Sequence, residues 1–232
     1  MHVTTVTPLA ADSGPPLFQW KWVDRNADAI VQRLVEHISL TGAALGIGLV
    51  VSIGLAVVSL RYRWSYPVIL GTTGALYVIP SLGAFAVLVP FFGLTFVSAM
   101  IPLATYTLLI LVRNIVTGVD QVPNEVREAA VGMGYTRGRL LWQIELPLAL
   151  PVVIAGLRVA AVTTIGLVTV TSMLGLGGLG YFIRGGIQTP IPNPTMIIVG
   201  VGLSVVLAVV VDLVLWLGER VLAPWSRKVR AR

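Results

Sequence analysis

The sequence contains no cysteine and few of the residues that bind metals or transfer protons. The absence of cysteine excludes disulfides, thiolate metal sites and cysteine nucleophiles. The two histidines, His2 and His37, belong to no HExxH pattern. We therefore expect no metal centre and no histidine-based catalysis. No convergent Ser/His/Asp cluster favours a membrane-embedded enzyme either.

Charge is the second deficit. Only 11% of the 232 residues are charged, whereas 56% are hydrophobic. A soluble domain averages about 25% charged and roughly 45–50% apolar residues. Because so few ionisable groups cannot cover a water-exposed surface, the sequence predicts an integral membrane protein. The first residues lack a basic stretch followed by an apolar core, so we expect no cleavable signal peptide and a first span that acts as its own signal.

Long apolar runs are what the chain has instead. A span needs about 20 mainly apolar residues, and five segments qualify: 38–60, 66–90, 94–112, 150–174 and 195–217. The sequence thus predicts an all-α integral membrane protein with five transmembrane helices in a domain at residues 38–217. In residues 1–37, apolar side chains recur at helical spacing towards Ile38, which favours a helix lying on the membrane surface.

Lysine and arginine predict the orientation of these spans. Eleven basic residues follow the first, third or fifth segment, whereas four lie on the opposite side. By the positive-inside rule, the N-terminal segment 1–37 is extracytoplasmic, and the loop 117–149 and the basic tail 218–232 are cytoplasmic. The net charge of +6 is then a signal of topology, and we expect no binding to nucleic acid.

The loop 117–149 is the most polar stretch in the middle of the chain. It has the signals of two short helices: Glu125 suits the first turn of one, Gly134 its end, and Thr136 the cap of the next. Ala129 and Ala130, together with neighbouring glycines, give a face almost without side chains. Two interpretations remain open from these residues alone, a connector at the membrane surface or a docking face for a cytoplasmic partner.

The same loop resembles a known family signature. It reads Glu128-Ala129-Ala130, three residues, Gly134, nine residues, and then Ile144-x-Leu146-Pro147. This is similar to the EAA motif, EAA-x3-G-x9-I-x-LP, of permease subunits in bacterial ABC importers. The resemblance implies the type I permease fold, a location in the bacterial inner membrane, and a loop that docks onto a cytoplasmic ATPase dimer.

The resemblance also implies that the chain performs no chemistry and binds no cofactor. ATP and Mg would be held by the separate ATPase. Neither of the two lysines, Lys21 and Lys228, lies in a GxxxxGK[ST] loop, which agrees with that division of labour. Further implied partners are a second permease subunit, identical or paralogous, an extracytoplasmic solute-binding protein and the surrounding membrane lipid.

Within the family, the sequence looks most similar to osmoprotectant permeases. The residues that suggest this are Ile79-Pro80-Ser81-Leu82, Ala155-Gly156-Leu157-Arg158, Gly175–Gly180 and Val211-Asp212. The implied activity is inward transport of glycine betaine, carnitine, choline or a proline-like solute by alternating access. Methionine-type and other small-solute permeases share the plan and remain alternatives, as does an ATP-independent secondary transporter built around Asp212.

Two groups of residues inside the apolar segments are candidates for the transport path or its gate. Pro80 and Ser81 interrupt the second segment, either as a structural kink or as a broken helix beside the path. Gly175, Gly177 and Gly178 follow the fourth segment and predict an external turn or gate.

Arg158 and Asp212 are the ionisable residues most clearly inside predicted spans. Both are expected roughly 10–12 Å deep from the cytoplasmic side, at 1.5 Å per helical residue. Because an unpaired charge in the bilayer is costly, we expect them to form an ion pair between the fourth and fifth spans. The alternative is that each side chain reaches the interface or a polar gap separately.

Overall fold

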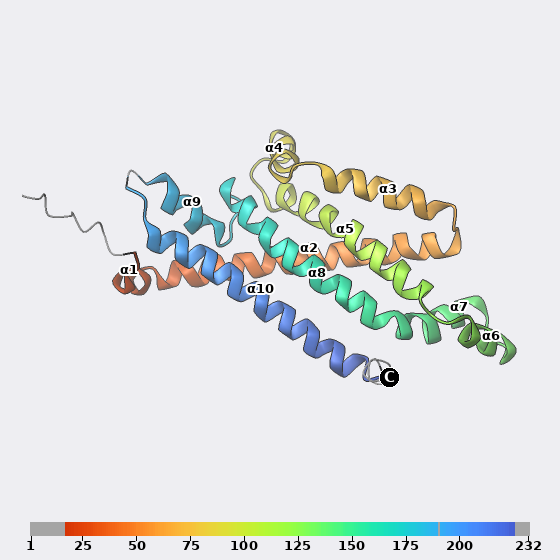
Figure 1. The fold of residues 1–232 in the computed structure, drawn as a ribbon. Helices are drawn as coiled ribbons and strands as arrows, with labels where there is room; N and C mark the ends of the chain where they lie inside the picture. The colour runs from red at the N-terminus through yellow and green to blue at the C-terminus, as the bar shows by residue number, and fades with distance from the viewer. Residues whose placement is uncertain (1–16, 190, 226–232) are drawn as a thin grey trace, which may run out of the picture.

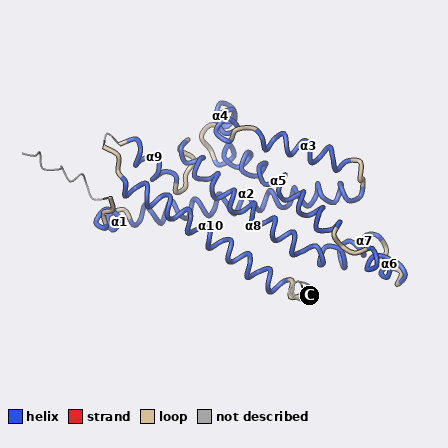
Figure 2. The backbone as a smooth tube through the Cα atoms, in the orientation of Figure 1, coloured by secondary structure: helices blue, strands red, loops and turns tan. Residues whose placement is uncertain are grey.

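The protein is a bundle of long helices, seen in a computed structural model that describes residues 17–189 and 191–225 (Figure 1). No strand occurs in these residues, and short loops join the helices (Figure 2). Four helices are long and apolar enough to cross a membrane: α2 (Ala27–Arg61), α5 (Phe96–Asp120), the run from α7 through α8, and α10 (Pro194–Leu222). A fifth crossing results if the bent pair α3 (Ser65–Val78) and α4 (Ser81–Phe92) is one span.

The shorter helices lie at the two ends of the bundle. At one end are α1 (Trp20–Arg25) and α9 (Gly180–Gln188). At the other end are α6 (Asn124–Gly132), α7 (Arg137–Leu140) and the π-helical turn η1 (Leu141–Glu145), which leads into α8 (Leu146–Met173). Figure 1 shows α6 and α7 projecting beyond the ends of the long helices.

Helix α5 forms the centre of the bundle and packs against α2, α3, α4 and α8. Its buried side chains include Leu103, Leu111 and Val112. The facing stripe of α2 is made of small and polar residues at spacings of three or four, from Thr41 to Ser59. Small residues let two helix backbones approach closely, because dispersion and short contacts replace the hydrophobic effect inside a membrane.

Two of the predicted segments have helix ends that the sequence did not define. Helix α2 begins at Ala27 and runs unbroken to Arg61, since no proline or strong capping signal interrupts it, so the helical spacing seen before residue 38 continues into the first span. The second segment, 66–90, is interrupted where Pro80 and Ser81 indicate: α3 and α4 meet there at an angle of 87°. Proline donates no backbone hydrogen bond and displaces the preceding residue from helical geometry.

Candidate coupling segment and transport path

Helix α6 begins and ends through local sequence signals. Pro123 precedes the helix, and Glu125 lies in its first turn, near the positive end of the helix dipole. At the other end, the Tyr135 amide donates to the Ala130 carbonyl at 3.1 Å and the Gly134 amide donates to the Val131 carbonyl at 2.9 Å. This pair of bonds is a Schellman motif, and it requires a left-handed residue, which is Gly134 with φ of +83°.

The motif residues of the coupling segment lie in three local environments. Glu128 and Ala129 are exposed on α6, and Ala130 is fully buried beneath them. Ile144 lies in η1, and Leu146 and Pro147 form the first turn of α8, all partly buried. The structure therefore places the first half of the motif on a projecting tip and the second half at the root of a long helix.

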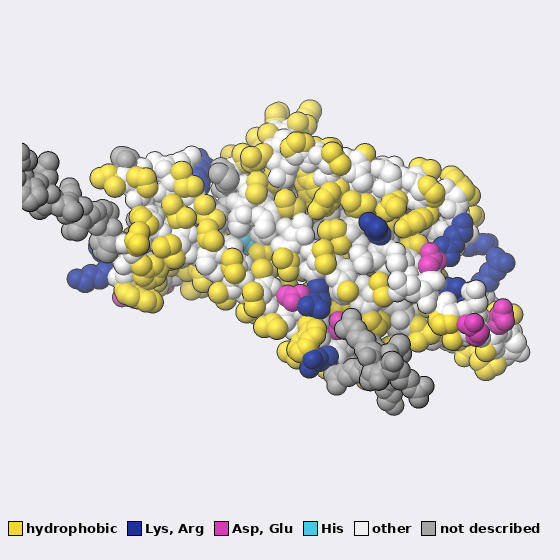
Figure 3. Space-filling view, viewed as in Figure 1, with side chains coloured by type: hydrophobic (Ala, Val, Ile, Leu, Met, Phe, Trp, Pro, Cys, Tyr) yellow, Lys and Arg dark blue, Asp and Glu magenta, His cyan; other side chains and the backbone are white. Residues whose placement is uncertain are grey.

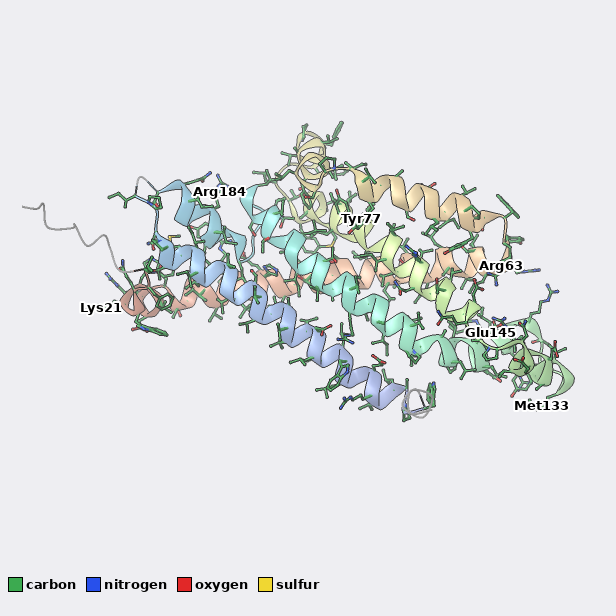
Figure 4. The ribbon with its side chains drawn as sticks, in the orientation of Figure 1. Lys21, Arg63, Tyr77, Met133, Glu145 and Arg184 are labelled. Carbon is green, nitrogen blue, oxygen red and sulfur yellow. The ribbon has the colours of Figure 1, made fainter. Side chains whose placement is uncertain are left out.

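The tip of the coupling segment is apolar where a solvent-facing loop would be polar. Val131 is 60% exposed and Met133 is 68% exposed, next to exposed Gly132 and Gly134. Met133 lies at the far end of the molecule in Figure 4. Contiguous exposed apolar residues of this kind typically mark a protein contact.

Sequence reasoning missed the residue that holds α6 to the bundle, Arg127. Its guanidinium donates from Nε to Glu145 Oε1 at 2.6 Å, from Nη2 to the Val119 carbonyl at 2.6 Å and from Nη1 to Asn124 Oδ1 at 3.2 Å. These contacts tie α6 to the end of α5 and to η1. No periodicity links position 127 to position 145, which is 18 residues away.

The π-helical turn η1 connects the coupling segment to α8. It ends two residues before Pro147, whose nitrogen has no hydrogen to donate to the preceding turn. Single π-helical turns are rare and concentrate at functional positions. Thr136 caps the short helix in front of it by accepting from the Arg139 amide at 3.5 Å.

The break between α3 and α4 is held from α5. The Ile79 carbonyl, left without an intrahelical partner, accepts a hydrogen bond from the Tyr106 hydroxyl. Tyr106 also contacts Tyr77 edge-on, with ring centroids 5.8 Å apart. Pro80 and Ser81 therefore lie at a supported bend. An apolar cavity of about 430 Å³ adjoins the bend, with Ile79, Gly83 and Tyr106 in its lining.

The glycine-rich turn after α8 is tied to α2. Gly175, Gly177 and Gly178 all have positive φ, which only glycine adopts without strain. Glu36 accepts from the Gly178 amide at 3.1 Å, and Glu36 itself pairs with Arg33 at 2.8 Å.

His37, on the same turn of α2, is fully buried. Its Nδ1 lies 3.2 Å from the Leu179 amide and its Nε2 lies 3.1 Å from the Ile165 carbonyl, so the ring donates to α8 and accepts from the turn. Sequence reasoning missed Glu36 and His37 as partners of this turn, because the contacts join residues 142 positions apart.

The structure brings Arg158 and Asp212 together. Arg158 donates from Nε to Asp212 Oδ1 and from Nη2 to Oδ2, each at 2.7 Å. Both side chains are partly exposed, at 28% and 34%, between α8 and α10. A two-bond fork of this kind fixes orientation as well as distance. No group of three or more His, Cys, Asp or Glu residues that could hold a metal ion occurs in the part of the chain that the structure describes.

The basic residues gather at opposite ends of the bundle. Lys21 and Arg184 lie at one end in Figure 4, and Arg63 lies at the other, near the coupling segment. Hydrogen bonds to Asp120, at 2.7 and 3.1 Å, raise the pKa of the Arg63 guanidinium. Apolar side chains cover most of the face between the two ends (Figure 3), as expected of a surface in contact with lipid.

Comparison with solved structures defines the class of protein. The chain superposes on a permease chain of the inward-facing MetNI methionine ABC transporter with a TM-score of 0.69, at 20% identity, over 83% of this chain and 94% of that one. A chain from an amino acid ABC transporter with histidines gives a TM-score of 0.72, at 17% identity, over 87% and 98%. The fold is therefore that of a type I ABC importer permease.

Sequence comparison gives the family. The family of binding-protein-dependent transport system inner membrane components matches residues 47–222, and the chain belongs to it. The protein is thus a multi-pass inner-membrane permease subunit. The osmoprotectant import permease protein OsmW of Salmonella typhimurium is 33% identical over 204 residues, covering 86% of this chain and 94% of its own. The choline transport system permease protein OpuBB of Bacillus subtilis is 33% identical over 204 residues, covering 88% and 93%.

Proposed function

We propose that the chain forms the membrane path of an ABC importer that brings an osmoprotectant into the cell, driven by ATP hydrolysis on a separate ATPase dimer. The apolar tip of α6, with Val131 and Met133 exposed and Arg127 anchoring its base, carries the proposal. A partner that binds this tip would bury its exposed apolar side chains. The similarity to osmoprotectant and choline permeases supports the solute class.

In this proposal the coupling segment lies in the cytoplasm and residues near α1 and α9 lie outside. The larger group of basic residues lies on the same side of the spans as the coupling segment, and by the positive-inside rule this supports a cytoplasmic position for that side. Closure of the ATPase dimer pulls the two coupling segments of a permease pair together, and η1 passes the motion to α8. Glu128, Ala129 and Gly134 contact the ATPase, and Ala130, which is buried beneath them, lies behind that contact surface. ATP and Mg remain on the ATPase.

The turn at Gly175, Gly177 and Gly178 and the bend at Pro80 and Ser81 border the solute path in this mechanism. An external binding protein delivers the solute to the end that carries the turn. Asp212, on which an ion-coupled transporter would depend, has both carboxylate oxygens engaged by Arg158. That pairing favours a structural role for the acid over ion coupling.

Co-isolation tests the coupling proposal. A tagged chain purified from native membranes is expected to bring a P-loop ATPase with it, and Gly134→Asp is expected to lose that partner. Residue 134 needs a left-handed backbone, so the substitution strains the end of α6 and adds a charge to the apolar tip. Gly218→Asp on α10 is the matched control, because nothing surrounds that glycine within 4 Å. If the ATPase accompanies both variants equally, or never accompanies the wild type, the proposal fails.

Uptake then tests the solute. Proteoliposomes holding the co-isolated complex and its binding protein are expected to accumulate radiolabelled glycine betaine or choline when ATP is supplied. Methionine serves as the comparison solute. Uptake of methionine alone would refute the osmoprotectant assignment and leave the importer assignment intact.

A further inference from the structure

A basic cavity opens beside the coupling segment. Its volume is about 630 Å³, and it lies between the end of α2, the turn into α3, the end of α5 and the α6–α7–η1 segment. Four arginines from three different segments line it: Arg61, Arg63, Arg127 and Arg137. Glu145 supplies the one carboxylate in the lining. The remaining lining is mostly apolar and consists of Val57, Leu60, Val119, Gly138, Leu140 and Leu141.

The positive charge of the basic cavity is only half compensated. Arg63 is paired with Asp120 and Arg127 with Glu145. Within the described residues, neither Arg61 nor Arg137 is paired with a carboxylate; Arg61 only lies over the Tyr62 ring, 5.5 Å from its centroid. Two guanidinium groups therefore face one cavity without an anion between them.

The basic cavity lies at the edge of the apolar surface. Val57 and Leu60 belong to α2, whose exposed apolar side chains continue away from the cavity through Val50 and Val51. Trp64 is 76% exposed next to Arg63, and exposed tryptophan is typical of the membrane–water interface. In Figure 3 dark blue side chains border the yellow surface at this end of the molecule.

We propose that the basic cavity binds the phosphate headgroup of an anionic phospholipid. Arg61 and Arg137 contact the phosphate, and the glycerol and upper acyl chain lie along Val57 and Leu60. Guanidinium groups suit phosphate oxygens because they donate in a planar fork. Basic pockets between helices on the cytoplasmic side of a membrane are a known form of headgroup site.

The apolar part of the lining, Val57 and Leu60, favours a phospholipid over free phosphate, because free phosphate has no apolar group to bury against these side chains. The position of the cavity distinguishes it from a protein partner. The exposed apolar tip suited to a protein is Val131 on α6 and Met133 directly after it, whereas the basic cavity lies nearer the long helices, beside Glu145. Arg61 belongs to α2 and Arg137 to α7, so a bound lipid would bridge a span to the coupling segment. The inference concerns lipid alone and does not depend on which solute is carried.

Native mass spectrometry of the delipidated full-length protein tests the proposal. Dioleoyl phosphatidylglycerol is titrated against the wild type and against Arg61→Ala/Arg137→Ala. Each basic residue near a membrane surface contributes about fivefold to anionic lipid affinity, so the double variant is expected to bind roughly 25-fold more weakly. Arg61→Lys/Arg137→Lys keeps both charges and is expected to retain most of the binding, which also shows that the site tolerates substitution.

Two controls make the measurement specific. Arg25→Ala/Arg184→Ala removes one arginine from α1 and one from α9, at the end of the bundle opposite the cavity (Figures 1 and 4). The affinity is expected to stay within about twofold, because salt screens charges that are separated by more than a Debye length of about 8–10 Å. Dioleoyl phosphatidylcholine has the same acyl chains without net negative charge, and no difference between variants is expected with it.

Three results would overturn the proposal. One is equal phosphatidylglycerol binding by the wild type and the alanine double variant. The second is complete competition by glycerol phosphate at the concentration at which the lipid itself binds, which would assign the cavity to a soluble anion. The third is loss of the co-isolated ATPase in the alanine variant with lipid binding unchanged, which would make the cavity a protein interface.

Discussion

Replacement of Arg127 by alanine is expected to release α6 from the bundle without unfolding the spans. The side chain makes three hydrogen bonds, to Glu145, the Val119 carbonyl and Asn124. The Arg127–Glu145 pair is largely shielded, with the two side chains 24% and 13% exposed. Removal of Arg127 also leaves the carboxylate of Glu145 without its cation.

The magnitude follows from these contacts. A hydrogen bond to a charged group contributes about 1.5–3 kcal/mol, and loss of one partner of a shielded pair costs more than loss of an exposed one. After allowance for water entering the gap, we expect the docked state of α6 to lose about 2–3 kcal/mol, which raises the undocked population roughly 30- to 150-fold. Arg127→Lys keeps the charge but not the three-way fork, and an intermediate value is expected.

Hydrogen–deuterium exchange of the detergent-solubilised protein measures this population. Peptides covering residues 124–135 are expected to exchange faster by that factor in Arg127→Ala, while peptides from the buried part of α5 remain unchanged. Arg139→Ala is the control, because that side chain only lies over Tyr135 at 5.2 Å. Unchanged exchange in α6 would refute the reasoning and show that other contacts hold the helix.

Two further predictions concern the contacts of α8. Reversal of either charge alone, Arg158→Asp or Asp212→Arg, is expected to reduce the yield of monodisperse protein from membranes, measured by fluorescence-detected size exclusion. The double reversal is expected to recover part of this yield. A double variant with no higher yield than the single variants would show that the pair does not stabilise the bundle. Gly180→Val is expected to lower the midpoint of thermal unfolding, at a cost of roughly 1–3 kcal/mol, because a Cβ at 180 would meet the Thr169 carbonyl and lie 2.8 Å from Ser172 Cβ. Gly166→Ala, with open space around it, is the control, and equal midpoints would contradict the close-packing argument.

The sequence was most informative where local chemistry decides the structure. Gly134 ends α6 and Thr136 caps α7, as their residue types predict, because each feature depends on a few neighbouring residues. The deficit of charge predicted the membrane class, and the coupling motif predicted the family to which residues 47–222 belong. The first prediction needs only the composition of the whole chain, and the second needs only the twenty residues 128–147.

Features that depend on distant contacts were not predictable in this way. Hydropathy alone does not separate a continuous span at residues 66–90 from two helices at 87°, because the bend is supported by Tyr106 of α5. His37 looked isolated in the sequence, and its two partners, Ile165 and Leu179, are more than a hundred residues away. Arg127 likewise holds α6 in place only because the fold brings Glu145 of η1 and the Val119 carbonyl of α5 within hydrogen-bonding distance of its guanidinium.

The unbroken course of α2 has a mechanical consequence. Its 35 residues correspond to about 52 Å of helix, longer than the roughly 40–45 Å of a whole bilayer with its headgroups. In its first third, Glu36 and His37 accept hydrogen bonds from the Gly178 and Leu179 amides of the glycine turn, and at the other end Arg61 borders the basic cavity. If an unbroken helix of this length tilts about its middle, its two ends move in opposite directions. Any tilt of α2 therefore couples events at the two faces of the membrane directly, with no relay through side chains in between.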